Sequence, residues 1–141
     1  LFYDIIYSED SFIHINNRNT IFKEINRILK PNGILIFSDI ILTDNHNKKE
    51  INEVYERVNI TNLETHESYL EKARNYNLDY IDCIEYKNSM LYHYKNIKDL
   101  VDNNEHNKHI LLGLTNWIKH IDLDNITTKL FIFKKLSDLQ D

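Results

Sequence analysis

The stretch that decides the fold is FYDIIYSEDSFIHINNRNTIFKEINRILKPNGILIFSD, residues 2–39. Its first six residues form a short, mostly apolar run of the kind that is buried on both faces of a parallel sheet. Asn17 then predicts a helix N-terminus, because an Asn side chain can cap the first free amide groups. The helix carries apolar residues at helical spacing, and these are Ile21, Phe22, Ile25, Ile28 and Leu29.

The turn signal Lys30-Pro31-Asn32-Gly33 predicts a sharp end to this helix, and the apolar residues 34–37 predict a second strand. The stretch is therefore one β-α-β unit. In open α/β sheets, ligands bind at the carboxyl ends of the strands. The polar clusters that follow the two strands, residues 8–14 and 38–44, are the first places to expect a site.

The rest of the chain alternates helices and strands. Apolar spacing predicts helices near residues 51–58, 65–76 and 106–121, and a further helix capped by Ser89. Residues 78–86 and 127–136 are rich in strand-forming residues and predict two more strands. The short helix near 51–58 is expected to cover a substrate site, with Glu53 four residues before Arg57 as a supporting ion pair.

Composition excludes several classes of protein. The 141 residues carry a net charge of −5 with interspersed signs, which argues against a nucleic-acid surface. There is no apolar run long enough for a membrane span, so no membrane partner is expected. The single cysteine, Cys83, rules out an internal disulfide framework and fits a reducing, cytoplasmic location.

The sequence resembles the second half of the class I S-adenosylmethionine-dependent methyltransferases. The segment from Asp4 to Ile15, the helix ending in Leu-Lys-Pro-Asn-Gly, and the strand ending in Ser38-Asp39 carry this resemblance. The cluster Tyr7, Ser8, Asp10 and His14 is narrower, and it is similar to the small-molecule N-methyltransferases that act on sarcosine and dimethylglycine or on phosphoethanolamine.

The resemblance implies an α/β fold: the C-terminal half of a doubly wound Rossmann-like methyltransferase sheet, with its last strand antiparallel. Residues 1–141 are then expected to be a partial methyltransferase domain, with strands four to seven of the family sheet. The chain begins with Leu1 and has only two glycines, neither in a Gly-rich loop. The half that carries the cofactor loop is therefore expected to lie outside this fragment.

The resemblance also implies site residues. S-adenosylmethionine is the expected cofactor, lined by Ser8 and Glu9, and a small amine is the expected substrate. Asp10 and His14 are the expected catalytic pair, because a carboxylate can accept a proton from an ammonium group and His14 can orient or take it. The alternatives are that Ser8, Glu9 and Asp10 form an ordinary turn and that His14 is an ordinary helix-edge histidine.

Three further residues are expected to bind the substrate. Arg57 could pair with a carboxylate, although a solvated pair with Glu53 is an equal alternative. His93 and Tyr94 match a family position facing the substrate pocket, but aromatic residues at helical spacing are more often core. No metal site is expected: His106 and His109 are three residues apart, without further ligands nearby, and fit a solvated helix face.

The acceptor and the class of function have alternatives. The phosphoethanolamine enzymes have phosphate-holding tyrosines where this sequence has Ile40 and Asn59, so a phosphobase is disfavoured but remains an alternative. A different class is a non-catalytic, partner-binding remnant whose exposed half-sheet pairs with another chain, because an unpaired sheet edge is a template for association. A homodimer, or pairing with the missing N-terminal half, is the expected form of such an assembly.

Overall fold

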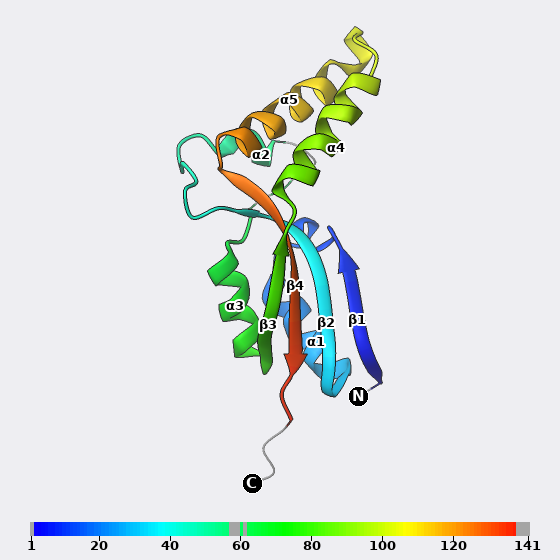
Figure 1. Cartoon of the computed structure of the whole chain (residues 1–141), viewed down its shortest axis with the longest axis vertical. Coiled ribbons are helices and arrows are strands. Elements are labelled where there is room, and N and C mark those ends of the chain that lie inside the picture. Colours follow the sequence, from blue (N-terminus) through cyan, green and yellow to red (C-terminus); the bar gives the residue numbers. More distant parts are fainter. Residues whose placement is uncertain (1, 57–59, 61, 138–141) are drawn as a thin grey trace.

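The computed structural model describes residues 2–56, 60 and 62–137 and contains a four-stranded sheet (Figure 1). The strand order is β1-β2-β4-β3, with β1 at Tyr3–Glu9, β2 at Leu29–Leu42, β3 at Leu78–Glu85 and β4 at Ile126–Lys135. β1 and β2 are parallel, whereas β4 is antiparallel to both of its neighbours. The predicted α/β fold with an antiparallel last strand is confirmed.

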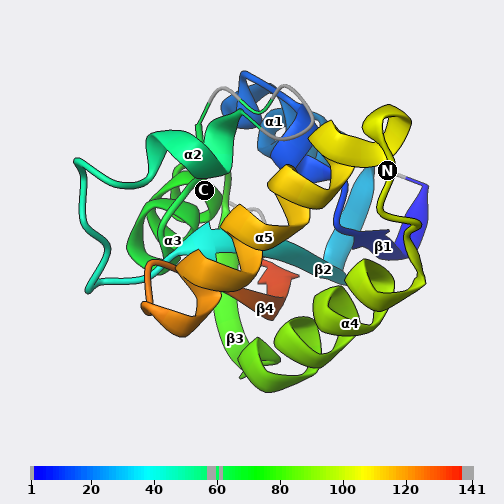
Figure 2. The same ribbon diagram turned by 90° about the horizontal axis from the view of Figure 1, so that it is seen from above.

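Two helices pack on one face of this sheet: in Figure 1 one lies behind the strands and the other to the left of β3, and in Figure 2 both are on the same side of the sheet. The first, α1, spans Arg18–Ile28, and the Asn17 side chain caps it by accepting from the Thr20 amide at 3.4 Å. The second, α3, spans His66–Asn75 and begins with a capping box between Thr65 and Ser68. Both caps satisfy amide groups that a helix start leaves free.

The main core lies between this helical layer and the sheet, and Phe37 is at its centre. The Phe37 ring is 4.4 Å from the Phe12 ring and 5.2 Å from the Phe131 ring, between centroids, in stacked arrangements. It also meets Tyr69 of α3 edge to face at 5.1 Å. These rings are fully or almost fully buried, so this layer supplies most of the apolar burial that holds the sheet to α1 and α3.

A second cluster of buried residues joins the upper ends of β2 and β4 to three helices: α2 at Asn52–Tyr55, α4 at Lys87–Leu100 and α5 at Lys108–Asp122. Two short 3-10 turns, η1 at Phe12–His14 and η3 at Glu105–Asn107, precede α1 and α5. Trp117 of α5 is 1% exposed, and its indole N–H donates to the Val54 carbonyl of α2 at 3.1 Å. This bond ties α2 to α5.

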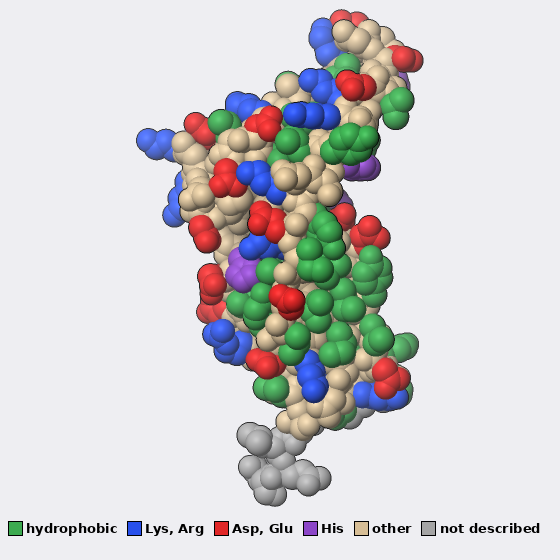
Figure 3. Space-filling model, in the orientation of Figure 1, with side chains coloured by type: hydrophobic (Ala, Val, Ile, Leu, Met, Phe, Trp, Pro, Cys, Tyr) green, Lys and Arg blue, Asp and Glu red, His purple; other side chains and the backbone are tan. Residues whose placement is uncertain are grey.

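The opposite face of the sheet is largely open and apolar. The strand register puts Ile5 beside Ile34, Tyr7 beside Ile36, and Ile84 beside Leu130 on this face. Ile5 is 62% exposed and Tyr7 60% exposed, and hydrophobic side chains gather over the strands in Figure 3. The prediction that the first strand is buried on both faces is therefore wrong, because nothing among the described residues pairs with its outer edge or covers this face.

Some element boundaries also differ from the predictions. α2 is a single turn, and the remainder of the expected helix near residues 51–58 lies partly outside the described residues. α4 begins at Lys87 with Tyr86 at its N-cap position, not at Ser89. α1 ends at Ile28, shortly before the turn signal at residues 30–33, but β2 starts at the next residue, Leu29.

The turn signal at residues 30–33 forms an irregularity inside the β1–β2 ladder. The register passes from Tyr3–Leu29 directly to Ile5–Ile34, and Asn32 has a φ of 65°. Lys135 closes the adjoining helix end, because its Nζ donates to the carbonyls of Asn26 and Leu29 at 2.6 and 3.0 Å. A lysine at a helix C-terminus meets both the free carbonyl groups and the negative end of the helix dipole.

Within the residues that the structure describes, no helix combines the length and the hydrophobicity that a membrane crossing requires.

Candidate active site at the carboxyl ends of the parallel strands

A cleft of about 450 Å³ lies where the carboxyl ends of β1 and β2 meet the start of α4. Glu9 and Asp10 line it from the end of β1, and Ser38 lines it from β2. His93 and Tyr94 line it from α4, together with Ser89 and Met90. Four residues predicted from the sequence as site residues, Glu9, Asp10, His93 and Tyr94, are thus brought together around one opening.

Asp10 is held in an unusual backbone conformation at the edge of this cleft. Its φ of 48° is in the left-handed region, where Asp is one of the few non-glycine residues found routinely. The Asp10 amide donates to the Ser38 carbonyl at 2.9 Å, and the Ser38 hydroxyl donates to Asp10 Oδ1 at 3.0 Å. Ser38 therefore fixes both the backbone and the carboxylate of Asp10.

The other predicted residues of this turn are placed differently. Glu9 is exposed, and the Tyr7 hydroxyl donates to its Oε2 at 3.2 Å. Ser8 is half-buried within β1 and is not among the residues that line the cleft. His14 is exposed on η1 and also does not line it. The structure thus brings Glu9 and Asp10 into the cleft but leaves Ser8 and His14 beside it.

His93 and Tyr94 are adjacent on α4 with their rings 5.4 Å apart between centroids. His93 is exposed, whereas Tyr94 is half-buried and its ring lies 5.6 Å from that of Trp117 in an edge-to-face contact. Tyr94 therefore belongs to the upper core and lines the cleft as well.

Arg57 lies outside the described residues. Its expected partner, Glu53, is engaged elsewhere: Glu53 Oε2 is 2.9 Å from Lys119 Nζ and 2.9 Å from His120 Nε2. The hydrogen bonds from Lys119 and His120, in that order of strength, hold the pKa of Glu53 below its usual range. His120 is fully buried, and its Nδ1 lies 3.0 Å from the Asn125 amide nitrogen.

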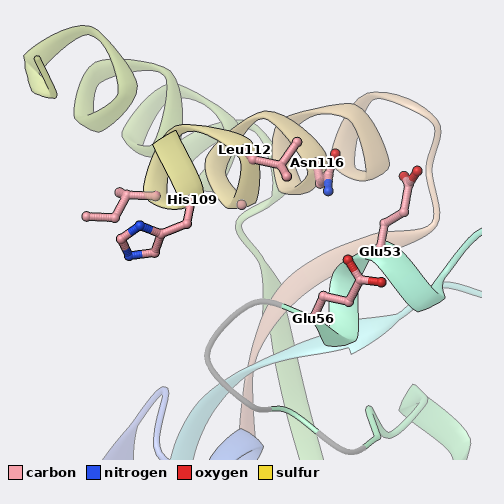
Figure 4. Close-up of a pocket in the computed structure, with 7 residues that line it drawn as sticks. Glu53, Glu56, His109, Leu112 and Asn116 are labelled. Carbon is pink, nitrogen blue, oxygen red and sulfur yellow. The ribbon is translucent and has the colours of Figure 1, made fainter. Parts of the chain in front are cut away.

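A second hollow, of about 470 Å³, lies between α2 and α5 (Figure 4). Glu53 of α2 and Glu56, the residue after α2, line one side of it, and His109, Leu112 and Asn116 line it from α5. None of the predicted site residues that the structure describes lines it. In the part of the chain that the structure describes, no group of three or more His, Cys, Asp or Glu side chains is arranged to hold a metal ion.

Sequence reasoning missed three buried polar residues beside the cleft. Asp39 is 1% exposed, and its carboxylate accepts from the Ile13 amide at 3.2 Å and from the Tyr69 hydroxyl. Burial raises the pKa of Asp39 to about 7, against the hydrogen bond from Tyr69, the charge of Arg18 and the Ile13 amide. Burial, followed by the charge of Asp39, also raises the pKa of Tyr69 above its ordinary value.

Arg18 is the third of these residues, and it is only 2% exposed although it is the first residue of α1. Its guanidinium donates to the carbonyls of Phe12 and Ile13 at 3.1 and 3.2 Å, and it also pairs with Glu64 at 3.4 Å. A sequence signal for Asp39 existed, since it follows the apolar run that predicts the second strand, although β2 continues to Leu42. Arg18 had none, because an arginine in the first turn of a surface helix is ordinarily solvated.

Comparison with known proteins identifies the class of fold. Residues 2–37 match a family model described as a methyltransferase domain. The crystal structure of a Galdieria sulphuraria protein described as a sarcosine dimethylglycine methyltransferase superposes with a TM-score of 0.87 at 24% identity, covering 96% of this chain and 54% of that chain. The chain therefore has part of a Rossmann-like fold that it shares with methyltransferases of known structure, as the sequence predicted.

In sequence, the chain is similar to a more specific group of methyltransferases. A glycine/sarcosine/dimethylglycine N-methyltransferase of Actinopolyspora halophila is 24% identical over 127 residues, which are 83% of this chain and 22% of that protein. A sarcosine/dimethylglycine N-methyltransferase of Aphanothece halophytica is 25% identical over 126 residues, 82% of this chain and 46% of that protein. The predicted resemblance to this group is confirmed, and the chain spans about half or less of the length of these relatives.

The same fold occurs in a geranyl diphosphate C-methyltransferase of Streptomyces coelicolor, solved in complex with S-adenosyl-L-homocysteine. The TM-score is 0.78 at 12% identity, and the match covers 94% of this chain and 47% of that chain. The fold therefore accommodates methyltransferases whose named substrates differ widely, and the substrate has to be argued from the cleft itself.

Proposed function

We propose that this chain is part of an S-adenosylmethionine-dependent N-methyltransferase that acts on a small amine such as sarcosine or dimethylglycine. The observation that carries the proposal is the Asp10 carboxylate, fixed by Ser38 at the rim of a cleft at the carboxyl end of β1. The relatives named above support the choice of an amine. A phosphobase such as phosphoethanolamine is the alternative acceptor.

The chain is in this proposal a partial methyltransferase domain. Its four strands correspond to strands four to seven of the family sheet, and the remaining strands, with the cofactor loop, complete it along β1. Three observations support this arrangement: no strand among the described residues pairs with the outer edge of β1, the sheet face beside it is open and apolar, and the relatives are longer than this chain. A cytoplasmic location fits Cys83, a free and half-buried thiol in β3.

The chain's residues suit the cofactor. S-adenosylmethionine supplies an electrophilic methyl group on a positively charged sulfonium. Two carboxylates, Glu9 and Asp10, and the ring of Tyr7 line the cleft on the β1 side, and carboxylates and aromatic faces both favour a cation. Glu9, with Ser8 behind it in the strand, would hold the cofactor from this side.

The same cleft suits a protonated amine. Because Ser38 engages Asp10 Oδ1, the carboxylate has Oδ2 for the substrate ammonium. Asp10 would orient the nitrogen and accept a hydrogen bond from it, and His14, four residues on, would take up the proton that must leave before attack. His93 and Tyr94 would close the opposite wall, and Arg57 would meet a substrate carboxylate.

Asp10→Asn in the complete gene product tests the proposal. The amide keeps a hydrogen-bond acceptor for Ser38 but loses the charge that holds an ammonium, so methyl transfer from S-adenosylmethionine to sarcosine should fall about 100-fold or more. Asp79→Asn is the matched control, because Asp79 is an exposed β3 residue at the other end of the sheet. Equal rates for Asp10→Asn and the native enzyme would refute the role of Asp10.

A second candidate function is a non-catalytic domain that binds a protein partner. The exposed apolar residues of β1 and β3 on the open sheet face favour it. Calorimetric titration of S-adenosylmethionine into this chain and into the complete gene product separates the two candidates. Binding of S-adenosylmethionine by the complete protein supports the enzyme. If neither protein binds S-adenosylmethionine but the chain still associates with itself or with another protein, the binding domain is supported.

A further inference from the structure

Ser38 and Asp39 are neighbours near the carboxyl end of β2, and their side chains lie on opposite faces of the sheet. Successive residues of a strand point to opposite faces. Ser38 accordingly lines the cleft, whereas Asp39 is buried on the side that α1 and α3 cover. The turn that joins β1 to η1 passes over this end of the strand, so both side chains reach it.

The two side chains bind this segment at two points, Asp10 in the turn and Ile13 in η1. On the cleft side, Ser38 bonds the amide and the carboxylate of Asp10. On the buried side, Asp39 Oδ1 accepts from the Ile13 amide, three residues further on, at 3.2 Å. Because Asp10 has a left-handed backbone, a conformation that costs free energy for residues other than glycine, these bonds help to hold the turn in its shape. The Ser11 hydroxyl adds a bond within the turn by donating to the Glu9 carbonyl at 2.9 Å.

Residues from two helices support the hydrogen bond between Asp39 and Ile13 on the buried side of the turn. The Tyr69 hydroxyl of α3 donates to Asp39 Oδ2 and occupies the second carboxylate oxygen. Arg18 of α1 donates to the carbonyls of Phe12 and Ile13, on the other side of the same turn. Glu64 pairs with Arg18 and is in turn bonded by Lys72 at 3.1 Å. Each of these charged groups therefore has a partner, as burial requires.

We propose that Asp39 and Tyr69 are positioning residues that, with Ser38, clamp the β1–η1 turn and so hold Asp10 at the cleft. Neither Asp39 nor Tyr69 lines the cleft, so both act through the backbone of Ile13. The clamp itself rests on the hydrogen bonds above. Its consequence for methyl transfer rests on the proposed function.

The first experiment measures hydrogen exchange at the Ile13 amide by NMR in the full chain. Tyr69→Phe removes one hydroxyl from a buried ring site, and it should speed exchange at Ile13 about tenfold, the effect of losing one hydrogen bond to a charged group. Tyr76→Phe is the matched control, because Tyr76 is the half-buried C-cap residue of the same helix, remote from the turn. Unchanged exchange in Tyr69→Phe, or equal acceleration in both variants, overturns the clamp.

Asp39→Asn tests whether the charge of Asp39, and not only its shape, holds the Ile13 amide. The amide can accept from Ile13 and donate to Tyr69, so the clamp should persist without a titrating group. In the native chain, exchange at Ile13, corrected for its intrinsic pH dependence, should rise a few-fold as the pH falls through 7, since charge-assisted bonds are about twice as strong as neutral ones. Arg18, Tyr69 and Asp10 are the groups whose charges bear on Asp39. A pH dependence retained in Asp39→Asn overturns the assignment.

The second experiment measures methyl transfer by the complete enzyme. Tyr69→Phe should lower kcat about tenfold while the KM for the amine changes less than about twofold, because the variant misaligns Asp10 without removing it. An unchanged kcat overturns the catalytic consequence. If the native enzyme methylates no amine, the proposed function fails, and the exchange rates at Ile13 alone decide whether the clamp exists.

Discussion

The two faces of β2 differ in how far other elements of the chain cover them. One face presents Leu35, Phe37, Asp39 and Ile41, all nearly inaccessible to water, to α1 and α3. The other presents Ile34, Ile36 and Ser38, which remain half-exposed beside the exposed Ile5 and Tyr7 of β1. Both faces are equally apolar in sequence. In this chain, apolar residues of β2 are therefore buried only where another element covers them.

Replacing an aromatic residue on the covered face should have the largest effect. Phe37→Ala removes a ring that stacks on Phe12, Phe131 and Phe133, and it should lower the free energy of unfolding by about 3–5 kcal/mol. Ile36→Ala, its neighbour on the open face, should cost less than half as much. Urea unfolding followed by circular dichroism measures both. Equal losses would mean that the open face is covered in solution.

The buried carboxylate on the covered face should make stability depend on pH. The pKa of Asp39 is about 7 in the folded chain against an ordinary value of 3.8, so between about pH 4 and 7 the folded state binds the proton and the unfolded state does not. Native stability, relative to that of Asp39→Asn, should therefore fall as the pH rises through this window and level off above it. The expected slope is on the order of 1 kcal/mol per pH unit at most.

Thermal unfolding of the native chain and Asp39→Asn from pH 4 to 8 tests this pH dependence. The difference between the two proteins isolates Asp39 from other groups, such as Glu64. Burial tends to raise the pKa of Glu64, but hydrogen bonds from Ser68 and Lys72 and the charges of Lys72 and Arg18 outweigh it and leave the pKa below its ordinary value. Parallel stability curves would show that Asp39 stays ionised throughout.

A buried ion pair and an exposed one should differ in how much they contribute to the free energy of unfolding. Arg18→Met leaves the partly buried Glu64 without its guanidinium and frees the carbonyls of the η1 turn, so a loss of about 3 kcal/mol is expected. Lys30→Met breaks the exposed pair with Asp4 at the β1 edge, where less than about 0.5 kcal/mol is expected. Urea midpoints measure both, and a comparable loss for the two variants would contradict the comparison.

A charge on the open face should have the smallest effect on folding and a clear effect on association. Ile5→Lys changes a side chain that is 62% exposed, so the free energy of unfolding should move by less than about 0.5 kcal/mol. The same change puts a charge on the apolar surface and should reduce self-association of the chain in sedimentation velocity. Glu24→Lys, at an exposed position of α1 on the other side of the sheet, is the control. Unchanged association would show that the open face is not adhesive.

Much of the fold could be predicted from local signals. The β-α-β unit, the Asn17 cap and the antiparallel last strand follow from periodicity, capping chemistry and the family resemblance. Of the candidate site residues, Glu9, Asp10, His93 and Tyr94 share one cleft. Asp10 and Glu9 could be found because a polar cluster after a buried-type strand marks the carboxyl edge of a sheet, a rule that depends only on topology.

The parts that could not be predicted depend on which face meets which neighbour. Nothing local distinguishes Arg18 from any other surface arginine, yet the backbone carbonyls of η1 and the Glu64 carboxylate surround it. Nothing local assigns Asp39 to Tyr69, thirty residues away. The same reason explains the incorrect prediction for β1, since an apolar run indicates only that a strand can be buried.

The amino-acid sequence by itself determined the order of helices and strands, the Asn17 cap and the end of the sheet at which Asp10 lies, and its resemblance to the methyltransferases indicated the class of fold. These depend on backbone preferences and on the spacing of apolar residues, which act over a few positions. Only the tertiary structure decided that Ser38 and Asp39 bind one turn from opposite sides, with Tyr69 and Arg18 behind it. Such contacts depend on the packing of α1 and α3 against β2, and no local pattern encodes that packing.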